Sequence, residues 1–188
     1  MEESDILLIK ECQTGDISAF GKLVELHRKR IYQLAYQITG NHEDADDISQ
    51  EAFIRAYRSV SKFKGESSFS TWLRRIAINL SINHLKKESR RGRESPDEEI
   101  LDSRIYPPIS EWADSPLEDV ESKELAQKIR QAMDSLPVVE RIVFILRVHQ
   151  GLSYKEMAQT LGCPMGTVMS RLNRARRRLR DKLKDYVI

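Results

Sequence analysis

A change of composition in the middle of the chain constrains the fold most. Residues 94–124 carry eleven Asp or Glu against only Arg104 and Lys123, and they include four of the six prolines. Because this segment lacks apolar periodicity, we expect an extended linker rather than a packed element. The chain is therefore expected to form two small domains, at residues 1–90 and 121–188, joined by an acidic linker at residues 91–120. Ser115 and Pro116 resemble the capped start of the helix that opens the second domain.

Both flanking regions have the pattern of helices. Apolar residues from Phe20 to Ile38 recur at steps of three and four, which indicates a long amphipathic helix. A short helix at residues 4–12 precedes it. Gly40 ends the long helix, and Asn41 caps a further helix with an acidic first turn that continues to about residue 60. A loop at residues 62–70 and a very apolar helix at residues 71–87 follow. No strand pattern is present, so the predicted fold is all-α.

The second domain has the pattern of a helix-turn-helix. Ser153 and Glu156 form a capping box that opens a short helix at residues 154–161, and residues 162–164 (GCP) supply the turn. A second helix from about Met165 has one apolar stripe and a polar, strongly basic opposite face. This arrangement is what docking in a DNA major groove requires. The helix-turn-helix is expected at about residues 154–175.

The basic face of this last helix has two other interpretations. A solvated basic helix end is favourable near the C-terminal dipole, and basic amphipathic helices also bind membranes. The apolar stripe is narrow and lacks aromatic residues, which fits a core-facing stripe better than a membrane anchor. The capping box, the turn and the segregation of faces together favour DNA. Arginine would contact phosphate or guanine, and Asn173 could pair with adenine.

Two asparagines interrupt the apolar helix of the first domain. Asn79 and Asn83 are four residues apart on one face, and Arg75 precedes them by one turn. The loop at residues 63–70 combines two aromatics, a glycine, hydroxyls and a lysine, a composition that suits capture of an unpaired base. The alternatives are an exposed polar edge for the asparagines and a core position for Trp72 and the two phenylalanines.

Three motifs, taken together, resemble the extracytoplasmic-function (ECF) group of bacterial sigma factors, and its envelope-stress subgroup in particular. Residues 44–56 (DADDISQEAFIRA) are similar to the motif by which these proteins hold core RNA polymerase. Residues 69–79 (FSTWLRRIAIN) are similar to the signature that follows it. Leu136-Pro137 and residues 151–158 (GLSYKEMA) and 166–172 (GTVMSRL) resemble the C-terminal domain of the family. The resemblance covers nearly the whole chain outside the linker.

The resemblance implies three binding surfaces. Those expected to bind the β′ clamp helices of core polymerase are Asp44, Asp47, Ile48, Gln50 and Glu51. Those expected at the −10 element, including capture of a flipped base, are Phe63, Lys64, Gly65, Ser67, Ser68, Phe69, Arg75, Asn79, Asn83, Lys86 and Lys87. Those expected at the −35 element are Thr167, Ser170, Arg171, Asn173, Arg174 and Arg177. Met169 replaces a basic residue of many relatives, and Ile82-Asn83-His84 also departs from the commoner pattern.

The expected function is promoter-specific initiation of transcription with core RNA polymerase, without covalent catalysis. The implied partners are the β′ clamp helices and the β flap of polymerase, promoter DNA and an anti-sigma factor. No cofactor or metal site is expected, and Cys12 and Cys163 are expected to be reduced. The start of the chain lacks a signal-peptide pattern and no membrane insertion is expected, so we expect a cytoplasmic protein, either free or held at the inner membrane by an anti-sigma factor.

Two other classes stay open on the residues alone. The chain could be a helix-turn-helix regulator that acts without core polymerase, although no effector pocket or heptad seam is evident. A DNA-cleaving enzyme is less consistent, because the dense carboxylates lie on one helix without a histidine or a second acidic strand. The acidic linker has two interpretations as well: it could occupy a nucleic-acid channel of polymerase, or it is a solvated spacer.

Overall fold

The computed structural model describes residues 3–91, 120–184 and 186, and these ranges are entirely helical apart from short connections. The elements, in chain order, are α1 (Glu3–Gln13), α2 (Ile17–Thr39), α3 (His42–Ser59), the 3₁₀ helix η1 (Val60–Lys62), α4 (Phe69–Arg91), α5 (Val120–Asp134), α6 (Val138–Val148), α7 (Tyr154–Leu161) and α8 (Met165–Leu183). The predicted all-α class is confirmed. The predicted linker and the start at Ser115-Pro116 lie outside the described residues.

Local capping signals set several of these boundaries. Gly40 has a φ of 76° and ends α2, with its N–H donating to the Tyr36 carbonyl. The Asn41 side chain then accepts from the Asp44 N–H and begins α3. Ser153 and Glu156 form the complete capping box at the start of α7. These boundaries were predictable because each depends on one or two neighbouring residues. Helix α4 is longer than predicted at both ends.

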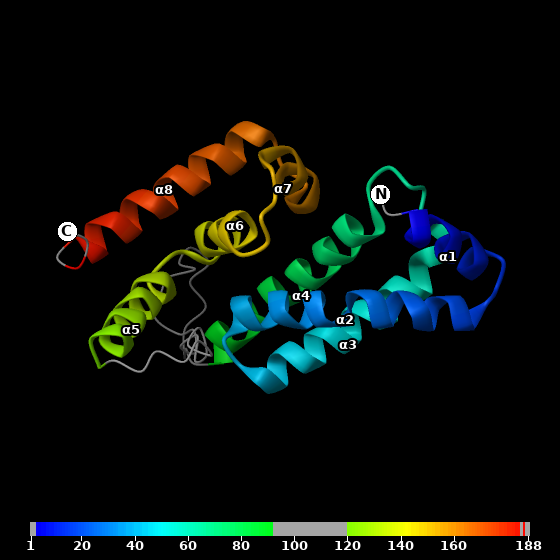
Figure 1. Ribbon diagram of the computed structural model, residues 1–188, viewed down its shortest axis with the longest axis horizontal. Coiled ribbons are helices and arrows are strands. Elements are labelled where there is room, and N and C mark those ends of the chain that lie inside the picture. The colour runs from blue at the N-terminus through cyan, green and yellow to red at the C-terminus, as the bar shows by residue number, and fades with distance from the viewer. Residues whose placement is uncertain (1–2, 92–119, 185, 187–188) are drawn as a thin grey trace.

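The first four helices form one bundle (Figure 1). Helices α2, α3 and α4 lie side by side, and α1 packs across the N-terminal part of α2. A cluster of buried side chains fills the centre, with Leu23, Phe53 and Leu73 among them. Asp5 and His27 are also buried there, joined by a contact of 3.1 Å between Oδ1 and Nε2. That contact ties α1 to α2.

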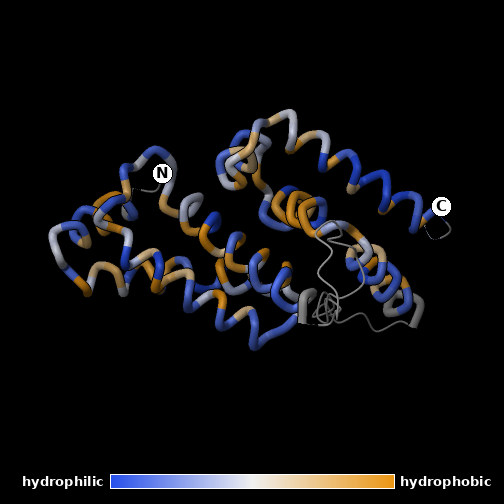
Figure 2. The backbone as a smooth tube through the Cα atoms, turned by 180° about the vertical axis from the view of Figure 1, so that it is seen from behind, coloured by the Kyte–Doolittle hydropathy of each residue, from blue (hydrophilic) through white to orange (hydrophobic). Residues whose placement is uncertain are grey.

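The last four helices form a second unit in which α8 packs on α5, α6 and α7. Val168, Leu172, Ala175 and Leu179 are the buried stripe of α8, as the periodicity predicts. Gly162 has a φ of 61° and ends α7, and the chain then turns into α8 at Met165. The predicted helix-turn-helix is thus present. Figure 2 shows that the C-terminal half of α8 is strongly hydrophilic, in contrast to α6.

The two units pack against each other. Leu34 and Ile38 of α2 and Ile78 and Leu85 of α4 share one apolar cluster with the buried residues of the last four helices. Arg141 of α6 is fully buried at this boundary and donates from Nη2 to the Ile38 carbonyl at 3.0 Å. The carbonyl belongs to the last turn of α2, where helix carbonyls lack an internal partner. The guanidinium thus caps a helix of the other unit.

None of the helices in the described ranges combines the length and apolarity needed to cross a membrane.

Candidate nucleic-acid and partner interface

The acidic face of α3 has one side on the core and one side in solvent. Asp47 and Gln50 are exposed, while Asp44 and Glu51 are half-buried. Glu51 accepts from Arg55 Nε at 2.6 Å, and Gln50 donates to Asp46 Oδ2 at 2.7 Å. Both pairs lie within α3. The acidic face therefore presents the carboxylate of Asp47, unpaired among the described residues, beside Asp46 and Glu51, whose carboxylates are bonded within α3.

Ile48, predicted to bind the partner, instead belongs to the core. Its side chain is 6% exposed and packs with Ala35, Tyr36 and Ala45. At 100° per residue, Ile48 points inward when Asp47 and Gln50 point outward. The apolar residue within the acidic motif therefore anchors α3 on α2, and the neighbouring polar residues remain for contact.

A cavity of about 520 Å³ lies between the loop after η1 and the N-terminal half of α4. Six of the residues predicted to contact the −10 element line it. They are Phe63, Lys64, Gly65, Ser67, Arg75 and Asn79. Gly65 has a φ of 72°, a conformation that disfavours side chains, so the glycine shapes the loop around the cavity. The structure thus brings the predicted loop and the predicted helix face together at one hollow.

Two of the predicted loop residues support the cavity rather than face it. Phe69 is fully buried, because it starts α4 with its ring against Phe63 and Trp72. Its predicted contact with DNA is therefore wrong. The Ser68 hydroxyl accepts from the Thr71 N–H at 3.1 Å and so caps the first turn of α4. Trp72 is half-buried and both packs on Phe63 and lines the cavity.

Several lining residues were not predicted from the sequence. Arg55 and Ser59 reach the cavity from the end of α3. Lys62 and Glu66 reach it from the two sides of residues 63–65 in the loop. Ile76 completes the apolar wall. Arg55 lies near the end of the polymerase-like motif and Ser59 follows it by one helical turn, yet only the packing of α3 against η1 and α4 places them here. The cavity therefore has more positive charge than the loop alone indicates.

The remaining predicted residues of α4 lie further along the helix. Asn83, Lys86 and Lys87 are exposed and do not line the cavity. Asn83 stands one turn beyond Asn79, so the two amides continue one face away from the hollow. The basic end of α4 extends that face.

Helix α7 covers part of this same helix α4. Arg74 is half-buried, and burial lowers its pKa from the ordinary value, an effect that the charge of Glu156 opposes. The Arg75 guanidinium lies so near the Gly162 turn that a Cβ there would come within 2.8 Å of it. The pKa of Glu156 is lowered chiefly by hydrogen bonds from Ser153. The helix-turn-helix and the cavity-bearing helix are thus in direct contact.

Among the described residues, no other helix covers the outward face of α8. Ser170, Asn173, Arg174 and Arg177 are exposed, whereas Thr167 and Arg171 are half-buried at its flank. The Ser170 hydroxyl donates to the Thr167 carbonyl at 3.0 Å. Arg178 Nε approaches buried Glu140 Oε2 at 3.2 Å, which fixes α8 on α6. The six predicted residues therefore lie together on the side of α8 that can approach a groove.

The histidines, cysteines and acids of the described ranges form no group of three that could hold a metal ion. Cys12 and Cys163 are free and half-buried, and burial is the main cause that raises the pKa of Cys12.

Comparison with known proteins identifies both units. The family model described as Sigma-70 region 2 matches residues 23–91, and the model described as Sigma-70, region 4 matches residues 126–179. The chain is 39% identical to the RNA polymerase sigma-H factor of Pseudomonas aeruginosa, over 93% of this chain and 91% of that one. It is 38% identical to the ECF RNA polymerase sigma factor SigW of Bacillus subtilis, over 94% and 95%.

A solved structure has the same arrangement. The sigma factor RpoE of Bartonella quintana, in complex with the anti-sigma factor NepR, matches with a TM-score of 0.70 and 25% identity over 91% of this chain and 100% of that one. The region 2 match ends with α4, and the region 4 match covers most of α5 to α8. With these matches over nearly its whole length, the chain belongs to the ECF RNA polymerase sigma factors, which bind core RNA polymerase and recognise promoters.

Proposed function

We propose that this sigma factor uses three separate surfaces, on α3, on α4 with its loop, and on α8. The domain boundaries that go with this proposal are residues 1–90 for core binding and the −10 element, 91–120 for the linker, and 121–188 for the −35 element. The observation that carries the proposal is the joint presence of an acidic helix face, a basic and aromatic cavity, and a free basic recognition helix in one chain.

The acidic face of α3 is the surface for the β′ clamp helices. Asp47 and Gln50 are exposed there, and Glu51 lies beside them. Complementary charge steers association and fixes register, so the partner surface should be basic. The second domain would contact the β flap. Neither contact involves a bond-making step, so the chain acts as an initiation factor and not as an enzyme.

The cavity beside α4 is the pocket for one base extruded from the −10 element. Phe63 and Trp72 offer apolar and aromatic surface, and Lys64, Arg75 and Asn79 supply donors. An extruded base costs a few kcal/mol of unstacking, which these contacts offset. Because the base enters only after unpairing, the pocket stabilises the open strands rather than the duplex.

The outer face of α8 reads the −35 element in the major groove. Arg171, Arg174 and Arg177 offer charge to phosphates and guanines, and Asn173 offers an amide to adenine. Met169 is 44% exposed on the flank of this face, so one basic contact of many relatives is replaced by an apolar side chain.

Simultaneous contact with both elements requires the two units to separate. The names −10 and −35 denote positions about 25 base pairs apart, which is about 85 Å along B-form DNA. In the structure, Arg75 touches the Gly162 turn, and α8 starts three residues later at Met165. The first turns of α8 therefore lie roughly 10–20 Å from Arg75. Polymerase binding would then have to open the contact between α4 and α7.

An anti-sigma factor is a further proposed partner, because the Bartonella quintana relative was solved in complex with one. We place the protein in the cytoplasm, free or held at the inner membrane by that partner. The acidic linker would then serve either as a spacer or as an occupant of a nucleic-acid channel in polymerase.

Strand opening tests the proposed −10 surface, which comprises the pocket loop and Asn83 one turn beyond the pocket. Asn83→Ala and changes at residues 65–68 should reduce permanganate reactivity of promoter thymines on duplex DNA more than they reduce initial duplex binding. On templates with a pre-melted bubble, transcription should recover in part, since the opening step is bypassed. Normal opening of duplex promoters by these variants would show that the loop and asparagines are ordinary surface.

Donor and acceptor dyes on exposed positions of α2 and α8 test the proposed separation. Energy transfer should be high in the free chain and should fall when core polymerase is added. Unchanged transfer on addition of core would exclude the proposed opening.

A further inference from the structure

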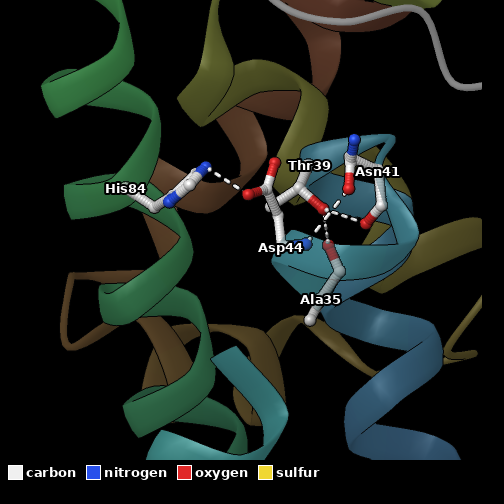
Figure 3. A network of polar contacts seen from close by, with 5 residues as sticks. All are labelled: Ala35, Thr39, Asn41, Asp44 and His84. Carbon is white, nitrogen blue, oxygen red and sulfur yellow. Dashed lines mark hydrogen bonds and ion pairs between the residues drawn. The ribbon is translucent and has the colours of Figure 1, made fainter. Parts of the chain in front are cut away.

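The acidic residues of α3 do not share the same surroundings. Asp46 and Glu51 are bonded to residues of α3 itself, and Asp47 has no hydrogen-bond or ion-pair partner in the described parts of the chain. Asp44 differs, because its Oδ1 lies 3.1 Å from Nε2 of His84 on α4. Figure 3 shows this contact bridging the two helices. The acid that begins the polymerase-like motif therefore faces the promoter helix.

Asp44 is also fixed from the side of α2. Its backbone N–H donates to the Asn41 side chain at 3.1 Å, and the Asn41 carbonyl accepts a long hydrogen bond of 3.4 Å from the Thr39 hydroxyl. The single proton of that hydroxyl is shared with the nearer Ala35 carbonyl, at 2.9 Å (Figure 3). The corner between α2 and α3 thus holds Asp44 in place. Its side chain is 30% exposed.

His84 lies on α4 between an exposed residue and a buried one. It follows Asn83, which is exposed, and precedes Leu85, which is buried in the core shared by the two units. The His84 side chain is 27% exposed, and Nε2 can donate to a carboxylate from a neutral or a protonated ring. Since neighbouring residues of a helix differ by about 100° in direction, fixing His84 also fixes the direction of Asn83.

We propose that Asp44 and His84 form a positioning pair that sets the rotation of the C-terminal half of α4, and with it the presentation of Asn83 to the promoter. Asp44 then acts in promoter opening and not in polymerase binding. This inference rests on the proposed function, which places polymerase on α3 and the −10 element on α4. A cation from polymerase would have to share the Asp44 carboxylate with His84, whereas Asp47 offers an unpaired one.

A set of matched variants can separate the two proposed roles of α3, polymerase binding through Asp47 and positioning of α4 through Asp44. Asp44→Asn, His84→Ala and the double variant are compared with Asp47→Asn, and Glu25→Gln on α2 serves as an exposed-acid control. Affinity for core polymerase is measured by fluorescence titration. The rate of open-complex formation on duplex promoter is measured at saturating core, so that a binding defect does not lower it.

We expect Asp44→Asn and His84→Ala to leave core affinity within about two-fold and to slow opening about five-fold, the size expected for one partly exposed charged hydrogen bond. The double variant should be no slower than His84→Ala alone, because once the imidazole is gone residue 44 has no contact with α4 left to lose. Asp47→Asn should show the reverse: weaker core binding with normal opening at saturation.

Two rescue variants separate positioning from folding. His84→Gln retains a donor and should open promoters faster than His84→Ala, and this gain should vanish when Asp44→Ala removes the acceptor. Thermal unfolding of each variant measures any loss of stability separately. If His84→Gln still opens promoters faster than His84→Ala when the Asp44 carboxylate is absent, the proposed positioning pair is wrong.

Other results of these measurements would contradict either the positioning role of Asp44 or the polymerase face of α3. If Asp44→Asn weakens core binding as much as Asp47→Asn, or if the two single effects on opening add, the positioning role is wrong. If Asp47→Asn leaves core affinity unchanged, the proposed polymerase face on α3 is wrong. The opening rates of the single and double variants of Asp44 and His84 would still test the positioning pair independently.

Discussion

The two helices that we propose read the promoter, α4 and α8, are presented in opposite ways. Helices α2, α3 and α7 pack against α4, and its polar residues Arg75 and Asn79 line a cavity shaped by a loop. Helix α8 rests on α5 to α7 through one buried stripe and leaves a basic face free. The difference fits the two targets, since an extruded base needs a shaped pocket and a duplex groove needs an open, charged helix.

Electrostatics separates the regions in the same way. Two ion pairs lie beside the proposed binding surfaces of the first region, one between Glu51 and Arg55 and one between Asp44 and His84. On α8, Arg174 and Arg177 are exposed and have no such partner in the described ranges. Ion pairs thus fix side chains beside the surfaces of the first region, whereas α8 presents positive charge that is unpaired within the described residues; the exposed, unpaired Asp47 of α3 is the exception in the first region.

The largest effect is expected at the acidic face of α3. Charge reversal at Asp47 and Glu51 should weaken binding to core polymerase by more than about 100-fold, because like charges at an interface cost several kcal/mol. A native gel or fluorescence titration with core enzyme measures the loss. Glu25→Lys, a reversal at an exposed acid of α2, should change affinity little. Unchanged affinity in the double reversal would remove α3 from the polymerase surface.

The next prediction tests whether the two regions are independent. Arg141→Met should lower the free energy of unfolding by about 3 kcal/mol, since it removes a buried charged donor from Ile38 and from Asp134. Amide hydrogen exchange should rise both at the end of α2 and in α6. Arg147→Met is the matched control, because within the described residues Arg147 donates to Leu152 and lies over the Tyr154 ring, both in its own region. Faster exchange confined to α6 in Arg141→Met would mean that the regions do not stabilise each other.

Substitution on α8 should reveal base reading. Arg174→Ala should weaken −35 binding, and if Arg174 reads a base the cost should be about 1–3 kcal/mol at one base pair. A uniform loss over all substituted sequences would assign the arginine to phosphate instead. Arg180→Ala serves as control, because Arg180 lies two turns later and pairs with Asp181. Quantitative binding to a set of single-substituted duplexes distinguishes these results.

A smaller effect is expected at the loop of the cavity. Gly65→Ala should slow promoter opening about ten-fold, because its φ of 72° strains any other residue by about 1–2 kcal/mol. The space around it is open, so the strain is purely conformational. Gly21→Ala in α2 also meets no neighbour, yet it has ordinary helical geometry and should be neutral or stabilising. Equal opening rates for the two variants would contradict a shaped loop.

The smallest effect concerns the cap of α7. Ser153→Ala should cost about 1 kcal/mol of stability at neutral pH. The folded pKa of Glu156 is lowered by hydrogen bonds from Ser153. A lowered pKa contributes stability above the ordinary value of 4.5, and that contribution disappears as the pH falls below it. Denaturant unfolding at pH 7 and at acidic pH should therefore show a shrinking difference between the variant and the native protein.

The sequence by itself determined the helices, their caps and the outward face of α8. Gly40, Asn41 and the Ser153–Glu156 box act within one turn, so local chemistry suffices to predict them. The stripe from Val168 to Leu179 predicted which side of α8 is buried. The three motifs also identified the family before any packing was known, because their order and spacing are specific.

Only the tertiary structure decided what each face meets. Periodicity placed Phe69 near a loop, but its burial depends on Phe63 and Trp72 closing over it. Likewise, no spacing rule links Arg141 to Ile38 or Asp44 to His84, which are far apart along the chain. A helical repeat specifies a direction around one helix axis, whereas a contact requires two axes to be placed against each other. That placement results from the packing of the whole chain.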